Sequence, residues 1–311
     1  MENEQAGLKI VVVGCGALGS AILQILGRLG IGTITMVDGD IVTPKNIGTQ
    51  TLYDLRDASG INYKSDVAKL KLEDINHSTV FKSLPFYLTG ENAEETLKGG
   101  DLVIDATDNS KSRLLINETC VRLGIPLLEV MAKADEAMVH LVHGDNACFN
   151  CLHSASRLVD NSCVSIDPAL SSIAAGAAVN MALGFLIGKD YSLKTALISA
   201  RTLSIERVNI KRLDTCEVCS KRVFKGEEGG HFLQICGDGI KYSFSKKIVL
   251  HDIYLRLSSY GEVEGDNNYI LLKNGSKSVL ISSYGDLLFT GYDIDEAKRF
   301  LEGTAPLFLS P

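Results

Sequence analysis

The chain has 311 residues, of which 45% are hydrophobic and 22% are charged, a composition that suits one large domain and a small one. The net charge of −7 argues against nucleic-acid binding, because neutralising phosphates requires a basic surface. Because the chain has no uninterrupted apolar run of about eighteen residues and no signal peptide at its start, we expect a cytoplasmic protein without a membrane span.

The most informative stretch begins with a β-branched run at 10–13, which predicts a buried strand. An amphipathic helix is predicted over about 17–30, and a second strand at 34–37 ends at Asp38. Between the first strand and the helix stand three glycines with G-x-G-x-x-G spacing: Gly14, Gly16 and Gly19. Such glycines let a phosphate approach the backbone, and the acid can accept bonds from ribose hydroxyls. The unit predicts nucleotide binding, and the alternative is a tight turn without a ligand.

A polar loop follows Asp38 and carries Asp40, Asn46 and Gln50. In open parallel sheets, ligands bind at the carboxyl ends of the strands, so this loop is a candidate part of the site. The alternative is turn chemistry, in which Asp and Asn side chains bond their own backbone.

Residues 64–75 predict a helix with Val67, Leu70 and Leu72 facing inward. Lys64 stands at its start, where a cation is unfavourable against the helix dipole. We therefore expect an anion near Lys64, and the alternative is a solvated lysine.

Asp108 and Asn109 follow a buried strand and open a helix. They are candidates for holding Mg²⁺ against nucleotide phosphates, and the alternative is a helix N-cap. The other elements alternate as expected for an α/β fold: strand 80–86, helix 91–97, strand 101–105, helix 111–123, strands 126–130 and 136–143, helix 169–186, and a strand pair at 197–200 and 203–210.

Two C-x-x-C knuckles, Cys148–Cys151 and Cys216–Cys219, predict a tetrahedral structural Zn²⁺ site that joins remote loops. Two redox dithiols are the alternative, which we disfavour because neither knuckle is predicted to open a helix.

Cys163 lies in a polar loop just before a predicted helix, whose dipole can stabilise a thiolate. A spare buried cysteine is the alternative. We assign no chemistry to Cys15, Cys120 and Cys236.

The glycine-rich segment at 225–230 predicts a domain boundary. We expect residues 1–225 to form a Rossmann-like domain, with a mostly parallel sheet and helices on both faces. Residues 226–311 predict a small α+β domain without a catalytic constellation, which we regard as a candidate partner-binding module. Its predicted elements are strand 231–236, helix 249–258, strands 268–273, 277–282 and 286–290, and helix 293–301.

The set GCGALGS, VDGDIV with its following Asn46 and Gln50, Lys64, ATDN and the two knuckles resembles the ThiF/MoeB/HesA family, relatives of the ubiquitin-activating enzymes. The resemblance covers roughly residues 8–222. It implies an ATP- and Mg²⁺-dependent adenylyltransferase that is a homodimer. Its partner would be a small β-grasp ubiquitin-like or sulfur-carrier protein ending in Gly-Gly, whose carboxylate receives AMP as pyrophosphate leaves.

The resemblance also implies roles by position. The three glycines would cradle phosphates and Asp38 would hold the ribose. Asn46 and Lys64 would position and neutralise the phosphates, and Asp108 would bind Mg²⁺. Cys163 resembles the crossover-loop cysteine that takes the activated carboxylate as a thioester or acyl-persulfide.

Two departures leave alternatives open. Thr49 stands where the family has an arginine, and the usual N-terminal helix with a second arginine has no expected counterpart before Leu8. Lys45, Lys64 or a partner would then supply the cation, or the chain is an impaired scaffold or heterodimer subunit. An NAD-dependent oxidoreductase is a further alternative that the glycine turn and Asp38 allow.

Overall fold

The computed structural model describes residues 5–153, 166–188, 194–224, 233–235, 239–244 and 246–309. They belong to two compact units. The first consists of Met1–Pro85 and Ala93–Gly226, and the second of Phe86–Asn92 and Glu227–Pro311. One boundary between the units lies between Gly226 and Glu227. The grouping of Phe86–Asn92 with the second unit has no sequence signal that we recognised.

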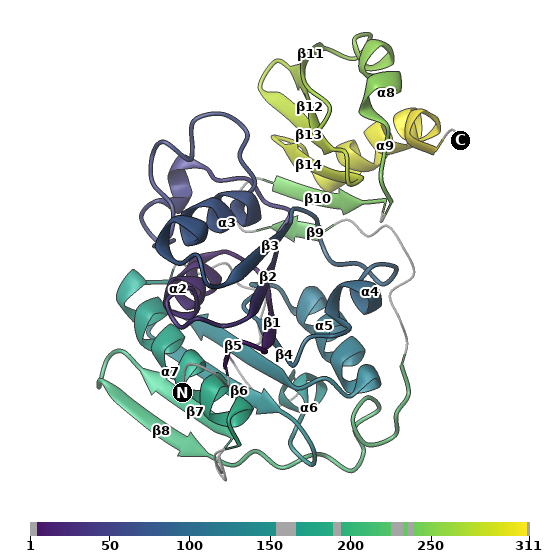
Figure 1. Ribbon diagram of the computed structural model, residues 1–311. Coiled ribbons are helices and arrows are strands. Elements are labelled where there is room, and N and C mark those ends of the chain that lie inside the picture. Colours follow the sequence, from purple (N-terminus) through teal and green to yellow (C-terminus); the bar gives the residue numbers. More distant parts are fainter. Residues whose placement is uncertain are drawn as a thin grey trace. The chain divides into compact units, whose positions relative to one another are not determined.

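An eight-stranded sheet forms the centre of the first unit, in the order β3-β2-β1-β4-β5-β6-β7-β8 (Figure 1). The pairs among β1 to β5 are parallel, and β6, β7 and β8 are added antiparallel. The strands are β1 Lys9–Val13, β2 Thr33–Val37, β3 Val80–Leu84, β4 Leu102–Asp105, β5 Leu127–Lys133, β6 Glu136–Val142, β7 Thr195–Ser199 and β8 Ser204–Val208. This is the predicted mostly parallel sheet.

Helices cover both faces of this sheet (Figure 1). Apolar side chains of α2, α3 and α7 join one buried core with the strands, and α4 packs with α5 away from that core. The helices are α2 Ala17–Leu26, α3 Lys64–Ile75, α4 Ala93–Leu97, α5 Ser110–Leu123, α6 Phe149–His153 and α7 Pro168–Leu186, with a short 3₁₀ turn η1 at Pro44–Asn46. The prediction for Leu70 is wrong, since its side chain is 63% exposed while that of Leu72 is fully buried.

By length and composition alone, helix α7 is apolar enough to cross a membrane. Half of its most apolar window is buried inside the molecule. Leu170, Ala174 and Ala178 of α7 belong to the same core as Leu18 and Ile22 of α2. The core helix of a globular unit passes the same test, so this feature is weak evidence for a span.

The second unit contains an antiparallel six-stranded sheet in the order β11-β12-β13-β14-β10-β9. Its apolar side chains pack with those of two helices around Phe289 and Leu257. Strands β10 and β11 were not predicted, and α9 is longer than expected. The elements are β9 Leu233–Ile235, β10 Gly239–Ser243, α8 Leu250–Leu257, β11 Glu262–Gly265, β12 Tyr269–Asn274, β13 Lys277–Ser282, β14 Asp286–Thr290 and α9 Ile294–Leu309.

Candidate functional site

The strand order of the first sheet reverses between β1 and β4, which are parallel neighbours with their neighbouring strands on opposite sides. Open α/β sheets bind ligands outside the carboxyl ends of the strands at this kind of switch point. The glycine turn follows β1, and residues 106–109 follow β4. The topology therefore brings together two loops that the sequence singled out separately.

Glycine occupies these three positions for different physical reasons. Gly14 has φ +90°, and a Cβ on it would lie 2.9 Å from the carbonyl of Ala106. A Cβ on Gly19 would lie 1.8 Å from the carbonyl oxygen of Gly14, so α2 packs this closely on the turn only because residue 19 is glycine. Around Gly16, however, a Cβ would meet open space. Packing explains the first two glycines, and the open space beside Gly16 fits the approach of a ligand.

Asp38 is fixed by backbone donors at the end of β2. Its Oδ2 accepts a hydrogen bond from the N–H of Cys15 at 2.7 Å, and its Oδ1 accepts one from the N–H of Asp40 at 2.8 Å. The hydroxyl of Ser65 donates to its carbonyl oxygen at 3.0 Å. The carboxylate is therefore held against the glycine turn, where it stays a candidate for bonding a nucleotide ribose.

Lys64 lies beside Asp40. Its Nζ is 3.0 Å from Asp40 Oδ2, and the two side chains are only 8% and 24% exposed. Its backbone N–H also donates to the carbonyl oxygen of Asp40 at 2.8 Å. The anion expected at the start of this helix is therefore present within the chain.

Burial works to lower the pKa of Lys64, but the charges of Asp40, Asp38 and Asp108 oppose it, and the pKa is raised above its usual value. The lysine consequently carries its positive charge at neutral pH, within electrostatic reach of three carboxylates. It is the candidate cation for bound phosphates.

Tyr53 is a site residue that sequence reasoning missed. Its hydroxyl donates to the carbonyl oxygen of Cys15 at 2.8 Å and lies 3.2 Å from that of Lys64. It thereby joins the glycine turn to the start of α3. A buried aromatic side chain within a polar loop was the available signal, since tyrosine buries its ring when its hydroxyl finds a partner.

The polar loop after Asp38 contains both turn chemistry and an unexplained group. Asn46 Oδ1 accepts bonds from the N–H of Thr43 at 2.8 Å and from its hydroxyl at 3.0 Å, so this oxygen stabilises the turn. Thr49 Oγ1 approaches the carbonyl oxygen of Asn46 at 3.5 Å. Gln50 is buried, and its Oε1 has no hydrogen-bond partner among the described residues. A buried polar atom of this kind usually marks a missing partner, so Gln50 remains a candidate for ligand contact.

The two residues that open α5 have different positions. Asn109 is the N-cap, and its Oδ1 accepts a bond from the N–H of Ser112 at 2.9 Å. Asp108 is exposed, and it lies close enough to Lys64 for its charge to raise the pKa of the lysine. A carboxylate with access to solvent beside a predicted phosphate loop is chemically suited to Mg²⁺.

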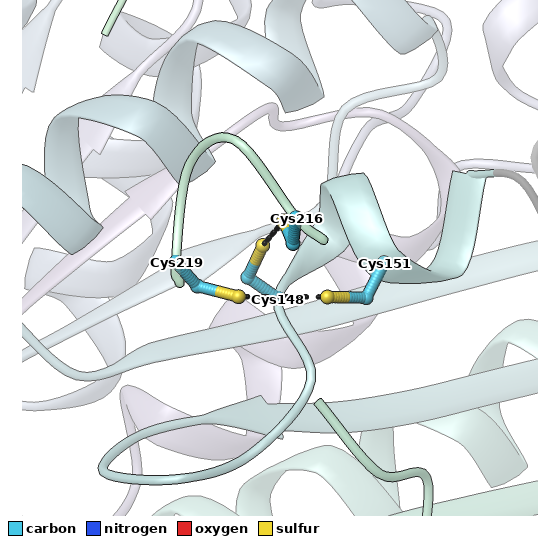
Figure 2. A group of neighbouring side chains, drawn as sticks. All are labelled: Cys148, Cys151, Cys216 and Cys219. Atoms are coloured by element: carbon cyan, nitrogen blue, oxygen red, sulfur yellow. Dashed lines mark hydrogen bonds between the residues drawn. The ribbon is translucent and has the colours of Figure 1, made fainter. Parts of the chain in front are cut away.

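The four knuckle cysteines form one buried cluster in the described part of the chain (Figure 2). Sγ of Cys148 is 3.7 Å from that of Cys216, and Sγ of Cys151 is 3.5 Å from that of Cys219. All four sulfur atoms lie within 4.8 Å of one another. A tetrahedron with Zn–S distances of about 2.3 Å places its sulfur atoms ~3.8 Å apart, so the cluster fits Zn²⁺.

Buried side chains fix the first knuckle. The N–H of Phe149 donates to Asn117 Oδ1 at 2.9 Å, and Asn117 Nδ2 donates to Asn150 Oδ1 at 2.9 Å, which attaches α6 to α5. His140 Nε2 lies 2.8 Å from the carbonyl oxygen of Ala147. Buried hydrogen bonds thus hold the knuckle in place.

The expectation that neither knuckle opens a helix is wrong, because Cys148 directly precedes α6. The contacts Cys148–Cys216 and Cys151–Cys219 nevertheless join one knuckle to the other, and all four sulfur atoms lie within 4.8 Å of one another. They are also far longer than an S–S bond of about 2.05 Å. A shared metal centre therefore explains the cluster better than two redox dithiols.

Hydrogen bonding favours a thiolate at one of these cysteines. Burial works to raise the pKa of Cys219, but hydrogen bonds from Arg212 and the neighbouring thiols lower it to about 7. Burial raises the pKa of Cys148. Zn²⁺ binds thiolates, so the metal would supply the positive charge that four buried sulfur atoms require. Cys163 and Cys236 lie outside the described residues.

The fold and the site define a Rossmann-like α/β protein with a four-cysteine candidate metal centre. The chain belongs to the ThiF family, whose model matches residues 4–219. It is 32% identical over 224 residues to the sulfur carrier protein adenylyltransferase of Thermus thermophilus, covering 68% of this chain and 81% of that protein. It is also 28% identical over 306 residues to the sulfur carrier protein ThiS adenylyltransferase of Bacillus subtilis, covering 93% and 90% of the two chains.

The fold also matches solved structures. The crystal structure of Escherichia coli MccB with ATP aligns with a TM-score of 0.60 and 21% identity, over 70% of this chain and 68% of that one. At 21% sequence identity, this structural similarity is evidence for a shared fold alone. The match to the Bacillus subtilis relative, by contrast, extends over most of both chains.

Proposed function

We propose that the chain is an ATP-dependent adenylyltransferase that activates the C-terminal glycine carboxylate of a ubiquitin-like or sulfur-carrier protein. The reaction is supported by the Thermus and Bacillus relatives, which are named as sulfur carrier protein adenylyltransferases. The convergence of the glycine turn, Asp38 and Lys64 at the switch point of the sheet is the observation that carries the proposal.

The residues at this point suit the chemistry. Attack of a carboxylate on the α-phosphorus of ATP requires positioning and charge neutralisation. The N–H groups at the start of α2, beside Gly16, would bind phosphate oxygens, and the Lys64 ammonium would offset their charge. Asp108 would hold Mg²⁺, which when bound neutralises charge on the phosphates.

The finer steps belong to the proposal as well. Cys163 would take the activated carboxylate as a thioester: its sulfur bonds the acyl carbon as the bond to AMP breaks, and the thiol proton leaves. An acyl-persulfide would form in the same way if a sulfur donor had first placed a persulfide sulfur on Cys163. We further propose a cytoplasmic homodimer and a partner-binding role for the C-terminal unit. Zn²⁺ would be structural, because all four of its ligands come from the protein and leave no open position for a substrate.

Thr49 favours a second candidate, a nucleotide-binding scaffold or heterodimer subunit that does not adenylate alone. Its hydroxyl lies near a backbone carbonyl and supplies no cation. Loss of a transition-state arginine lowers phosphoryl-transfer rates by about 10³–10⁵-fold. Wild-type protein that is inactive alone but active with a related subunit would favour this candidate.

ATP–pyrophosphate exchange with a Gly-Gly-ending carrier tests the proposal. Wild type is expected to exchange label only with the carrier present, and Asp108→Asn is expected to reduce the exchange strongly. Asp74→Asn, which changes an exposed acid on α3, is the matched control. Exchange that is insensitive to Asp108→Asn, or preferential binding of NADH over ATP, would contradict the proposal.

A further inference from the structure

Two acids and an arginine form a buried carboxyl cluster beneath the 106–109 loop: Asp105, Glu129 and Arg113. Both carboxyl side chains are fully buried, and the arginine side chain is 7% exposed. Asp105 on β4 and Glu129 on β5 are in register on parallel neighbouring strands, so their side chains lie side by side. Buried acids are rare unless paired, and here two acids face a single guanidinium.

The hydrogen bonds leave one oxygen of each acid without a donor. Asp105 Oδ1 accepts bonds from the N–H of Thr107 at 2.8 Å and from its hydroxyl at 2.6 Å. Glu129 Oε2 accepts a bond from Arg113 Nη1 at 3.2 Å. Asp105 Oδ2 and Glu129 Oε1 remain buried with no partner among the described residues. A proton held between these two oxygens would satisfy both.

The surrounding charges also favour a proton on this pair of carboxyl groups. Burial and the neighbouring charge of Asp105 raise the pKa of Glu129, and Arg113 offsets only part of this effect. Cys120 on α5 and His140 in register on β6 are the titratable neighbours, and burial raises the pKa of the thiol and lowers that of the imidazole. Both are therefore neutral at pH 7, and Arg113 is the cation that faces the pair.

The cluster also determines the position of the loop above it. Arg113 Nη2 donates to the carbonyl oxygens of Thr107 and Val130, while Asp105 holds the N–H and hydroxyl of Thr107. Thr107 is thus held at both its N–H and its carbonyl, and Asp108 follows directly. We propose that Asp105 and Glu129 share one proton, leaving a single negative charge opposite Arg113, and that this cluster positions residues 107–109 for nucleotide binding.

The positioning role rests on the proposed function, because it assumes that Asp108 serves bound MgATP. Amide variants separate the alternatives. In Glu129→Gln or Asp105→Asn, an amide N–H replaces the shared proton, and the remaining carboxylate still faces Arg113. The double variant removes the only negative charge and leaves the guanidinium buried without a counter-ion, which is costly.

Infrared spectroscopy of the full chain without nucleotide tests the shared proton. Wild type is expected to show the C=O stretch of a protonated, hydrogen-bonded carboxyl group that both single variants lack and that Glu136→Gln, an exposed control on β6, retains. If this band is absent from wild type, or persists in both single variants, the proposal that the two acids share a proton is wrong. This measurement does not depend on any activity.

Hydrogen exchange and MgATP titration test the positioning. The single variants are expected to bind a fluorescent ATP analogue with Mg²⁺ within about threefold of wild type, and the double variant about tenfold or more weakly, which corresponds to ~1.4 kcal/mol. Without nucleotide, the amides at 107–109 are expected to exchange faster in the double variant. Unchanged exchange and affinity in the double variant would overturn the positioning role.

Failure of the proposed function can be distinguished from failure of the inference about the carboxyl cluster. If wild type fails to bind MgATP, the proposed function fails, while the infrared and exchange measurements still decide the cluster. If circular dichroism shows that the double variant does not fold, Arg113→Met replaces it, since that variant also releases Thr107 and is expected to increase exchange at 107–109. Unchanged exchange in Arg113→Met would equally overturn the positioning role.

Discussion

A Cβ on Gly19 would lie 1.8 Å from the carbonyl oxygen of Gly14, whereas a Cβ on Gly16 would meet no atom within 4 Å. The G-x-G-x-x-G pattern therefore combines a packing requirement with a vacant approach to the backbone. Substituting Gly19 and Gly16 one at a time separates the packing requirement from the role in ligand approach.

Gly19→Ala is expected to destabilise the protein by about 1–3 kcal/mol, because overpacking against backbone outweighs the ~0.5–1 kcal/mol that alanine gains in a helix. Gly16→Ala is expected to leave the melting temperature almost unchanged and to weaken MgATP binding by about tenfold or more. Calorimetry and nucleotide titration measure both effects. Wild-type affinity in Gly16→Ala would show that no phosphate lies beside this residue.

Lys64→Met is expected to cost about 3 kcal/mol, because it removes the largely buried ion pair between Lys64 and Asp40. The folded pKa of Lys64 is raised above its unfolded value of about 10.4, so the stabilisation is fully present below that pH and is lost only as the pH rises through the folded value. Urea unfolding at pH 7 and 9 should therefore give the same difference between variant and wild type. Lys69→Met on the same helix is the control, and a difference that shrinks by pH 9 would contradict the raised pKa.

Metal analysis of the purified protein is expected to give about one zinc per chain. Cys216→Ser should lower the zinc content and the melting temperature, whereas Cys120→Ala should leave the zinc content unchanged because Cys120 lies outside the cluster. The loss of stability should be smaller than the ~10–16 kcal/mol of zinc-finger peptides, since this unit also has a large apolar core. Full stability after complete chelation would argue against a structural metal.

Leu72→Ala is expected to destabilise the first unit by about 2–5 kcal/mol, because its side chain is fully buried in the core. Leu70→Ala, two residues away on the same helix, should change stability by less than about 0.5 kcal/mol. Denaturant unfolding of both variants measures the difference. Similar losses would mean that Leu70 is covered in the protein in solution.

Local patterns predicted most of the first unit. The β-branched runs, the glycine spacing and the helix over Lys64–Ile75 each depend on neighbouring residues, which the sequence displays directly. Leu70 was misplaced because α3 has a weakly amphipathic sequence, so its buried face could not be read from apolar spacing alone. The edge strand β11 has no buried residue in its short span, which leaves no hydrophobic pattern to detect.

The sequence by itself determined the nucleotide-type glycine turn, the alternation of strands and helices, and the two C-x-x-C knuckles, because each is a short-range pattern of residue types. Only the tertiary structure decided that Lys64 pairs with Asp40, that Tyr53 joins the turn to α3, and that two acids face Arg113 beneath the 106–109 loop. These contacts join residues that are 8 to 38 positions apart, and in no case do the intervening residues specify the partner. Strand register places Asp105 beside Glu129, and the packing of helices and loops against the sheet brings the other partners together independently of their separation in the chain.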